Sequence, residues 1–311
     1  MTKERGLNLI GQSLLFGATI AWGTSFFILK ETISEVPTFY VIAIRFVATA
    51  IGLSLIFFKK LKSMTKPTFY RGMFLGLILS LAYFSQTIGL ENTTPGQNAF
   101  LTSSYCVMCP FLLWIVFKEK PKFYNIFSAV LCLIGIGFIA LANSGGASGN
   151  VLLGNSLTLV SAVFFGLQII FIARFMKDGH DNIQLLIAEI LTAGVIMSVY
   201  TLCVELPIYG ASEFYLNSEQ IWKIVYLTVA CTLFAQTAQI IGQKYTSANQ
   251  SSLILSLESV FGTLFSVLFA DEKLSALIIV GFITVFIAMI ITELKLDPIK
   301  LFTRKNEDKN L

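Results

Sequence analysis

The stretch of sequence that decides the fold runs from Gly89 to Lys120 and reads GLENTTPGQNAFLTSSYCVMCPFLLWIVFKEK. A second stretch runs from Gly242 to Lys273 and reads GQKYTSANQSSLILSLESVFGTLFSVLFADEK. A shift of 153 residues superimposes the two and gives 7 identical positions out of 32. Unrelated stretches of this length share about two positions at ordinary residue frequencies. The chain therefore contains an internal repeat.

The composition indicates a membrane protein. Only 13% of the residues are charged and 55% are hydrophobic, and the mean hydropathy is +0.77. Soluble domains carry about 25% charged residues. Apolar stretches of about 20 residues, which suffice to cross a bilayer as helices, recur along the whole chain. We therefore predict an all-α integral membrane protein with ten transmembrane helices, at residues 9–29, 38–58, 72–90, 96–117, 124–142, 152–173, 183–204, 222–243, 248–269 and 276–294.

The basic residues of the loops predict the orientation. If both termini are cytoplasmic, eighteen loop Lys and Arg residues face the cytoplasm, in segments 1–8, 59–71, 118–123, 174–182, 244–247 and 295–311. The opposite side then holds Lys30, Lys223 and Lys273. This excess is the positive-inside pattern of a multi-pass protein of the cell membrane. The net charge of +4 therefore reflects topology, and we expect the lipid bilayer as a partner and no nucleic acid.

The repeat has inverted topology. Each copy holds five predicted helices, an odd number, so the sixth helix must cross the membrane in the direction opposite to the first. We predict a first repeat at residues 1–143, a linker at 144–151, a second repeat at 152–294 and a cytoplasmic tail at 295–311. Inverted repeats of this kind are typical of secondary transporters.

Short motifs in both copies resemble those of a known family. They are Trp22-Gly-Thr-Ser-Phe-Phe, Pro37, Arg45, Gly89-Leu with Thr93 and Pro95, Glu119, Tyr245-Thr-Ser-Ala and Glu272-Lys. Over about residues 9–294 the chain resembles the EamA family of the drug/metabolite transporter superfamily. The resemblance implies a basket-like bundle whose central cavity is lined mainly by helices 1, 3, 4, 6, 8 and 9, with helices 5 and 10 at the periphery. It also implies transport, mostly export, of amino acids, other metabolites or toxic compounds.

Polar side chains mark one face of the eighth predicted helix. This stripe, spaced by four, three and four residues, consists of Thr232, Gln236, Gln239 and Gln243. The repeat matches its two middle members with Tyr83 and Gln86 of the third helix. Such amides either line a watery cavity or hydrogen-bond between helices, because leaving them unpaired in lipid is costly.

Three ionisable residues, Arg45, Glu189 and Glu258, lie within predicted spans, where charges are rare and mostly functional. Glu258 is a candidate proton carrier, which would make protons the coupling ion, or a counter-charge for an amine. A structural carboxylate is the alternative. Arg45 binds either a substrate carboxylate or groups of neighbouring helices. Glu189, near the cytoplasmic end of its helix, is a candidate for charge pairing.

The remaining candidates lie on the first and fourth helices. Trp22 supplies either an aromatic wall or gate of the cavity, or packing. Tyr105 matches Glu258 in the repeat and shares a helix face with Asn98. Pro110 lacks a backbone donor and predicts a kink in the same helix. The predicted substrate-binding residues are thus Trp22, Tyr83, Gln86, Asn98, Tyr105, Gln236, Gln239 and Glu258.

The sequence lacks the patterns that indicate catalysis. Cys106 and Cys109 have the C-x-x-C spacing without a second Cys or His pair, His180 is the only histidine, and no Walker A motif is present. We expect no metal, no cofactor and no catalytic residue. An intramembrane enzyme, a receptor or a scaffold is a remote alternative.

These observations together predict a secondary transporter. We expect it to move a small polar or amphipathic metabolite, an amino acid or related compound, out of the cell. Transport would proceed by alternating access through a central cavity. A multidrug or nucleoside-like exporter with the same fold is the alternative.

Overall fold

The computed structural model describes residues 3–141 and 150–294, and every regular element among them is a helix. In lipid, a helix satisfies its own backbone hydrogen bonds, so apolar runs of this length fold as helices. The predicted all-α fold is confirmed. Most of the predicted linker 144–151 and the whole predicted tail 295–311 lie outside the described residues.

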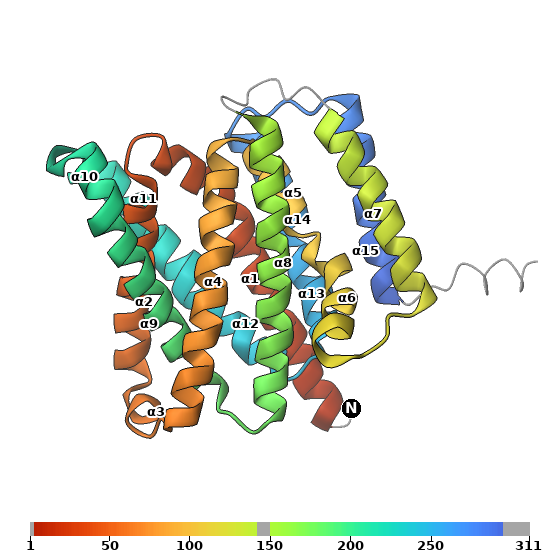
Figure 1. Ribbon diagram of the computed structural model, residues 1–311, viewed down its shortest axis with the longest axis horizontal. Coiled ribbons are helices and arrows are strands. Elements are labelled where there is room, and N and C mark those ends of the chain that lie inside the picture. Colours follow the sequence, from red (N-terminus) through yellow and green to blue (C-terminus); the bar gives the residue numbers. More distant parts are fainter. Residues whose placement is uncertain (1–2, 142–149, 295–311) are drawn as a thin grey trace, which may run out of the picture.

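The first half of the chain folds into seven helices. They are α1 (Lys3–Ile33), α2 (Thr38–Ile56), α3 (Phe58–Lys62), α4 (Lys66–Glu91), α5 (Pro95–Thr102), α6 (Tyr105–Phe117) and α7 (Phe123–Leu141). The lysine-rich helix α3 lies at the same end of the bundle as the N-terminus (Figure 1). We call this the inner end and the opposite one the outer end, following the predicted orientation.

The second half repeats this order with additional short elements. They are α8 (Val151–Lys177), α9 (Asn182–Tyr200), η1 (Thr201–Glu205), α10 (Leu206–Tyr209), η2 (Ala211–Phe214), α11 (Ser218–Thr228), η3 (Val229–Phe234), α12 (Ala235–Gln243), α13 (Ala248–Ser256), α14 (Glu258–Phe269) and α15 (Ala276–Leu294). The elements η1 and η3 are π-helical turns inside long helices, and η2 is a short 3₁₀ helix.

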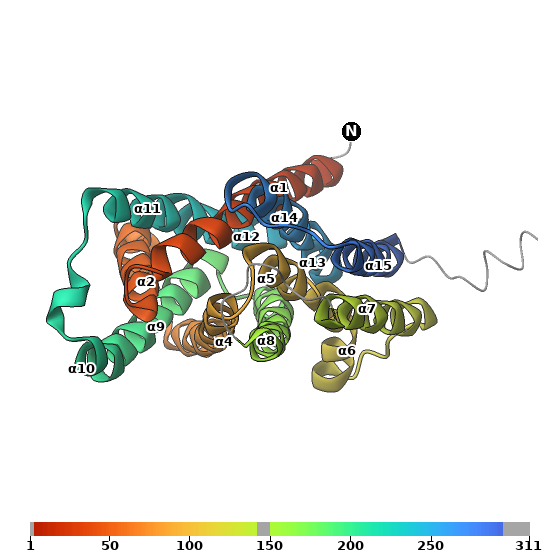
Figure 2. The same ribbon diagram turned by 90° about the horizontal axis from the view of Figure 1, so that it is seen from above.

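Eight helical segments of the described chain are long and apolar enough to cross a membrane, judged by length and composition alone. The apolar helices α7 and α15 complete the ten predicted spans. These two helices pack against each other at one edge of the molecule, as Figures 1 and 2 both show. This is the peripheral position that the family resemblance implies for helices 5 and 10.

Glycines let the helices of the two halves cross closely. A Cβ atom on Gly89 of α4 would lie 3.0 Å from the carbonyl oxygen of Gly154 in α8. A Cβ atom on Gly11 of α1 would lie 3.0 Å from the carbonyl oxygen of Gly242 in α12. The repeat relates these two crossings to each other: a shift of 153 residues matches Gly89 with Gly242, and a shift of 143 residues matches Gly11 with Gly154. The close packing of small residues therefore explains why Gly89 and Gly242 are identical in the two stretches.

Two of the membrane-crossing segments are interrupted at equivalent places. The fourth breaks at Ser103 and Ser104, between α5 and α6, and the ninth breaks at Leu257, between α13 and α14. Serine hydroxyls bond to backbone carbonyls beside both breaks, from Ser104 to Leu101 and from Ser256 to Leu253, each at 2.6 Å. Helix α6 continues through Pro110, so the interruption precedes the residue at which the sequence predicts a kink.

Candidate functional site

A cavity lies between the two halves of the bundle, with about 600 Å³ of space free of protein atoms. Its lining comes from α1, α2, α4, α6, α8, α12, α13 and α14. The part that water can occupy is about 40 Å³, which is space for about three water molecules. The cavity is therefore narrow in this conformation, and a ligand of metabolite size requires the surrounding helices to move apart.

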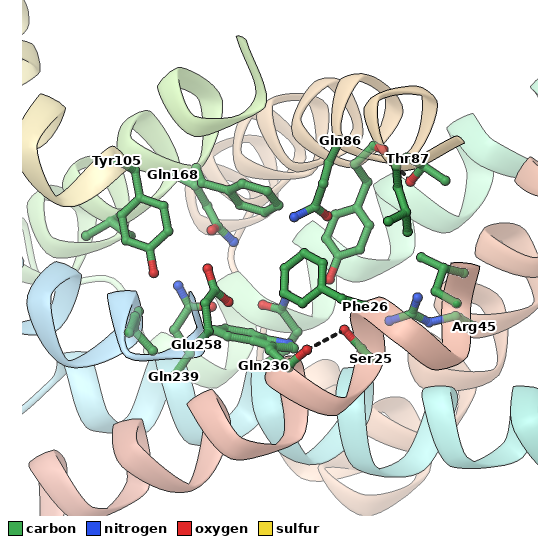
Figure 3. Close-up of a pocket in the computed structure, with 17 residues that line it drawn as sticks. Ser25, Phe26, Arg45, Gln86, Thr87, Tyr105, Gln168, Gln236, Gln239 and Glu258 are labelled. Carbon is green, nitrogen blue, oxygen red and sulfur yellow. Dashed lines mark hydrogen bonds between the residues drawn. The ribbon is translucent and has the colours of Figure 1, made fainter. Parts of the chain in front are cut away.

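Most of the residues that the sequence singles out meet in this cavity. Its wall includes Trp22, Arg45, Tyr83, Gln86, Tyr105, Gln236, Gln239 and Glu258. Figure 3 shows Gln86 and Gln168 facing Gln236 and Gln239 across the cavity. Glu258 and Tyr105 lie toward one end of it and Arg45 lies toward the other. The cavity therefore places a guanidinium and a carboxyl group toward its two ends, with four side-chain amides between them.

Arg45 presents unused hydrogen-bonding capacity to the cavity. Its side chain is 2% exposed, and Nε donates to Thr232 Oγ1 at 3.2 Å. The guanidinium carbon lies 5.9 Å from the centre of the Tyr83 ring. Nη1 is buried without a hydrogen-bond partner, and Arg45 forms no ion pair with any acidic residue that the structure describes. An arginine in this setting suits a carboxylate or another planar anionic group.

Glu258 is the acidic residue toward the other end of the cavity. It begins α14 directly after the break at Leu257, and it is 5% exposed. Ser103 Oγ, at the equivalent break of the first half, lies 3.5 Å from Glu258 Oε1, and the Tyr105 hydroxyl points to the carboxylate (Figure 3). No basic side chain in the described part of the chain forms an ion pair with it. Glu258 thus faces the cavity without a positive partner.

The π-helical turn η3 holds two residues of the site. The Trp22 indole nitrogen donates to the carbonyl oxygen of Cys231 at 2.8 Å. The Thr232 hydroxyl, which accepts from Arg45, donates to the carbonyl oxygen of Leu227 at 2.9 Å, five residues earlier. Such turns free carbonyl groups that a regular α-helix would use, and they are frequent at functional sites.

Two predicted site residues lie away from the cavity wall. Asn98 is fully buried, and its Nδ2 donates to Thr158 Oγ1 at 2.7 Å and to the carbonyl oxygen of Gln86 at 3.2 Å. It joins α5 to α8 and α4 instead of facing the cavity. Glu189 is also fully buried and accepts from Gln168 Nε2 at 2.5 Å, so it supports the cavity wall from behind.

Gln168 and Ser25 are cavity residues that sequence reasoning missed. The repeat could have identified both. The shift of 143 that matches Trp22 with Phe165 also matches Ser25 with Gln168, and all four line the cavity. Of the predicted polar stripe, Gln236 and Gln239 line the cavity, and Thr232 acts through Arg45. Gln243 instead lines a separate cleft at the inner end.

Comparison with known proteins decides the family. The family model of EamA-like transporters matches residues 9–141 and 152–294, which is once for each predicted repeat. The chain belongs to the EamA-like transporter family. The EamA fold accounts for the two-repeat architecture, and membership makes this chain a membrane transporter, as the composition and the resemblance predict.

Two relatives of the chain are described as transporters as well. The chain is 27% identical over 276 residues to an uncharacterized transporter of Archaeoglobus fulgidus, covering 89% of this chain and 83% of the relative. It is 21% identical over 270 residues to the uncharacterized transporter YoaV of Bacillus subtilis, covering 86% and 91%. A solved crystal structure superimposes with a TM-score of 0.66 at 17% identity, over 93% of this chain and 97% of that one. The solved structure supports the fold alone.

Proposed function

We propose that this EamA transporter exports a small zwitterionic metabolite, such as an amino acid, by alternating access through the cavity. The observation that carries the proposal is the placement of Arg45 and Glu258, neither of which has an ion-pair partner among the described residues, toward the two ends of the cavity. A zwitterion brings a carboxylate for the guanidinium and an ammonium group for the carboxylate. Export is the direction that the family resemblance implies.

Electrostatics favours a substrate with both charges. Charged groups away from water are costly unless they are paired and hydrogen-bonded, so each end of the cavity favours an opposite charge. A purely cationic drug would pair with Glu258 but would be repelled by Arg45. A neutral nucleoside would leave both charges unpaired. The arrangement therefore favours the zwitterion over the multidrug and nucleoside-like alternatives.

The rest of the lining suits an amphipathic molecule. Four glutamines offer both donors and acceptors to polar groups of the substrate. The aromatic rings of Trp22, Phe26 and Phe165 add an apolar surface for its side chain. We therefore expect amino acids with an apolar or aromatic side chain to bind better than small or charged ones.

Thermal melting of the purified protein tests the proposal, because a ligand of the native state raises its apparent stability. We expect at least one of the proteinogenic L-amino acids to raise the melting temperature. Its methyl ester, which lacks the negative charge, and its N-acetyl derivative, which lacks the positive one, should both fail to do so. The radiolabelled amino acid should then show counterflow into loaded proteoliposomes. The proposal of a zwitterionic substrate is contradicted if either derivative stabilises the protein as much as the amino acid does. It is also contradicted if no amino acid stabilises the protein.

A further inference from the structure

Glu119 and Glu272 correspond to each other in the repeat and stand in the same local backbone structure. Each directly follows a residue with positive φ just beyond the end of a helix, Lys118 at 62° after α6 and Asp271 at 50° after α14. These two are the non-glycine residues with positive φ in the described chain. The Glu119 amide bonds to the carbonyl oxygen six residues earlier at 3.3 Å, and the Glu272 amide does the same at the same distance. Both helices therefore end with the same turn.

The side chain of Glu272 closes the outer end of the bundle. Thr94 Oγ1 donates to its Oε1 at 2.6 Å, the backbone nitrogen of Gly96 donates to its Oε2 at 2.9 Å, and the Ser266 hydroxyl also donates to it. Thr94 is the N-cap of α5, so the carboxylate sits at the positive end of that helix. Glu272 is only 9% exposed. The loop after α14 is thus fastened to the first turn of α5.

The equivalent contact at the inner end is open. Glu119 is exposed, and its expected partner Ser247, the N-cap of α13, is exposed as well. Ser247 Oγ accepts from the backbone nitrogen of Gln250 at 3.2 Å, so the cap itself is formed. No hydrogen bond joins the first turn of α13 to Glu119 in the described structure. The site that Glu119 would occupy by symmetry is therefore formed but empty.

Helix packing is also closer toward the outer end than at the equivalent place toward the inner end. A Cβ atom on Gly23 of α1 would lie 3.0 Å from the backbone nitrogen of Gly262 in α14, toward the outer end. A Cβ atom on its counterpart Gly166 of α8 would have only side-chain atoms as its three nearest neighbours, the closest being Leu112 Cδ1 of α6 at 2.7 Å. The backbones of α1 and α14 thus approach more closely than those of α8 and α6.

We propose that Glu119 is the latch of the opposite conformation. When the cavity faces outward, the Glu119 carboxylate accepts from the Ser247 hydroxyl and the first turn of α13, as Glu272 now accepts from Thr94 and Gly96, and Glu272 is released. This inference rests on the proposed alternating access. Inverted repeats provide for such an exchange, because each half can adopt the conformation that the other half has now.

The two latches are not equally strong. A Cβ atom on Gly96 would lie 2.7 Å from Glu272 Oε2, so a larger residue there would push the carboxylate out of its present position. The counterpart of Gly96 at the inner end is Asn249, whose side chain would keep the Glu119 carboxylate farther from the backbone of α13. Ser266, the third donor at the outer end, has Leu113 as its counterpart. The closed outer end is therefore the more stable arrangement without substrate, and this is the arrangement in the structure.

Distances between spin labels at the inner end test the latch. Labels at Lys120→Cys and Lys244→Cys, two exposed positions, report on that end in a Cys203→Ser background. Glu272→Gln and Gly96→Ala each weaken the outer latch, the first by removing charge and the second by crowding the carboxylate. In membranes without substrate, we expect either change to increase the fraction of molecules in which the two labels lie close together by about tenfold. The reason is that each change weakens hydrogen bonds to the Glu272 carboxylate, and such bonds are strong. Adding Glu119→Ala should reverse this increase.

The controls separate the latch from folding and from the proposed function. Glu213→Gln removes an exposed carboxylate of the outer loop and should leave the distances unchanged. An increase that persists with Glu119→Ala, or no increase with either outer variant, overturns the latch. The distances are measured without substrate, so a failed melting test with amino acids does not alter their meaning. If an amino acid raises the melting temperature while Glu272→Gln and Gly96→Ala leave the label distances unchanged, the latch is overturned and the proposed function is not.

Discussion

Arg45 and Glu258 each face the cavity without a charged partner among the described residues. Several other charged side chains of the described chain form ion pairs, such as Lys60 with Asp181 at 2.6 Å. The buried Glu189 has no ion-pair partner either, but it accepts from Gln168 behind the cavity wall. An unpaired charge in a membrane-spanning segment is costly unless water or a ligand solvates it. We therefore expect these two residues to determine the ligand chemistry more than the amides between them do.

Replacing Glu258 with glutamine separates its two candidate roles. The change keeps the shape and removes the charge. As the anchor of an ammonium group, Glu258→Gln should weaken substrate binding about 10- to 100-fold at every pH, the range expected for a lost hydrogen bond to a charged group. Binding is measured by thermal melting, and transport by counterflow in proteoliposomes.

The other outcomes of this substitution are equally informative. Loss of pH-driven accumulation with intact exchange would make Glu258 the proton carrier and not the anchor. If driven transport and exchange are both unchanged, the carboxylate is structural.

Replacing Arg45 tests the other end of the cavity. Arg45→Gln should weaken binding of an amino acid about 10- to 100-fold, while its methyl ester, which has no carboxylate for Arg45, should leave the melting temperature unchanged in this variant as in the unsubstituted protein. Melting curves with both ligands measure this. A matched control is Arg71→Gln, because Arg71 lies at the inner end on the Phe175 ring and near Asp178, away from the cavity. An equal loss in both variants would indicate a general effect on folding.

The part of the candidate site that could be predicted from the sequence consists of residues that the repeat matches with each other. Tyr83 and Gln86 meet Gln236 and Gln239 in the structure as their matching positions suggest. Asn98 shares a helix face with Tyr105 only if the helix is continuous, and the break at Ser103 and Ser104 changes which way each half of that segment faces. This local backbone event depends on serine hydroxyls bonding to carbonyl groups, which periodicity does not encode.

At the scale of the elements, the ten spans followed from hydropathy because each must be apolar and long enough to cross lipid. The π-helical turns η1 and η3 did not follow, since a single extra residue leaves the apolar pattern nearly unchanged. Both turns lie in the second half, so the inverted repeats are similar but not identical. The cavity is correspondingly asymmetric, with an arginine held by η3 near one end.

The glycine crossings predict which helix positions reject larger residues. Gly242→Leu should lower the melting temperature markedly, because a Cβ atom there would already lie 2.7 Å from Leu15 Cγ and 2.9 Å from the carbonyl oxygen of Gly11. Overpacking of this kind costs about 1–3 kcal/mol or more. Gly137→Leu in α7 is the control, since no atom lies within 4 Å of a Cβ atom there. Equal melting temperatures for the two variants would contradict the close crossing.

At the scale of the whole molecule, the loop charges predict that both termini are cytoplasmic. In a Cys203→Ser background, Ser148→Cys in the predicted outer linker should react in intact cells with a thiol reagent that cannot cross the membrane. Lys62→Cys in α3 should react only after lysis, because α3 lies at the inner end. The reverse pattern of labelling would invert the assigned orientation and, with it, the direction of every proposed step.

The π-helical turn η3 has a consequence for how this chain tolerates the loss of a residue. Deleting one residue from a regular α-helix rotates all that follows by about 100° about the axis. A π turn already contains one residue more than the α-helical path needs. Deleting the exposed Val229 should therefore convert η3 into regular helix and keep the faces of α11 and α12 in place.

The shortened chain should fold. Trp22 and Arg45 should lose their hydrogen bonds to Cys231 and Thr232, and the protein should no longer bind its ligand. Deleting the exposed Val160 from α8 should prevent folding.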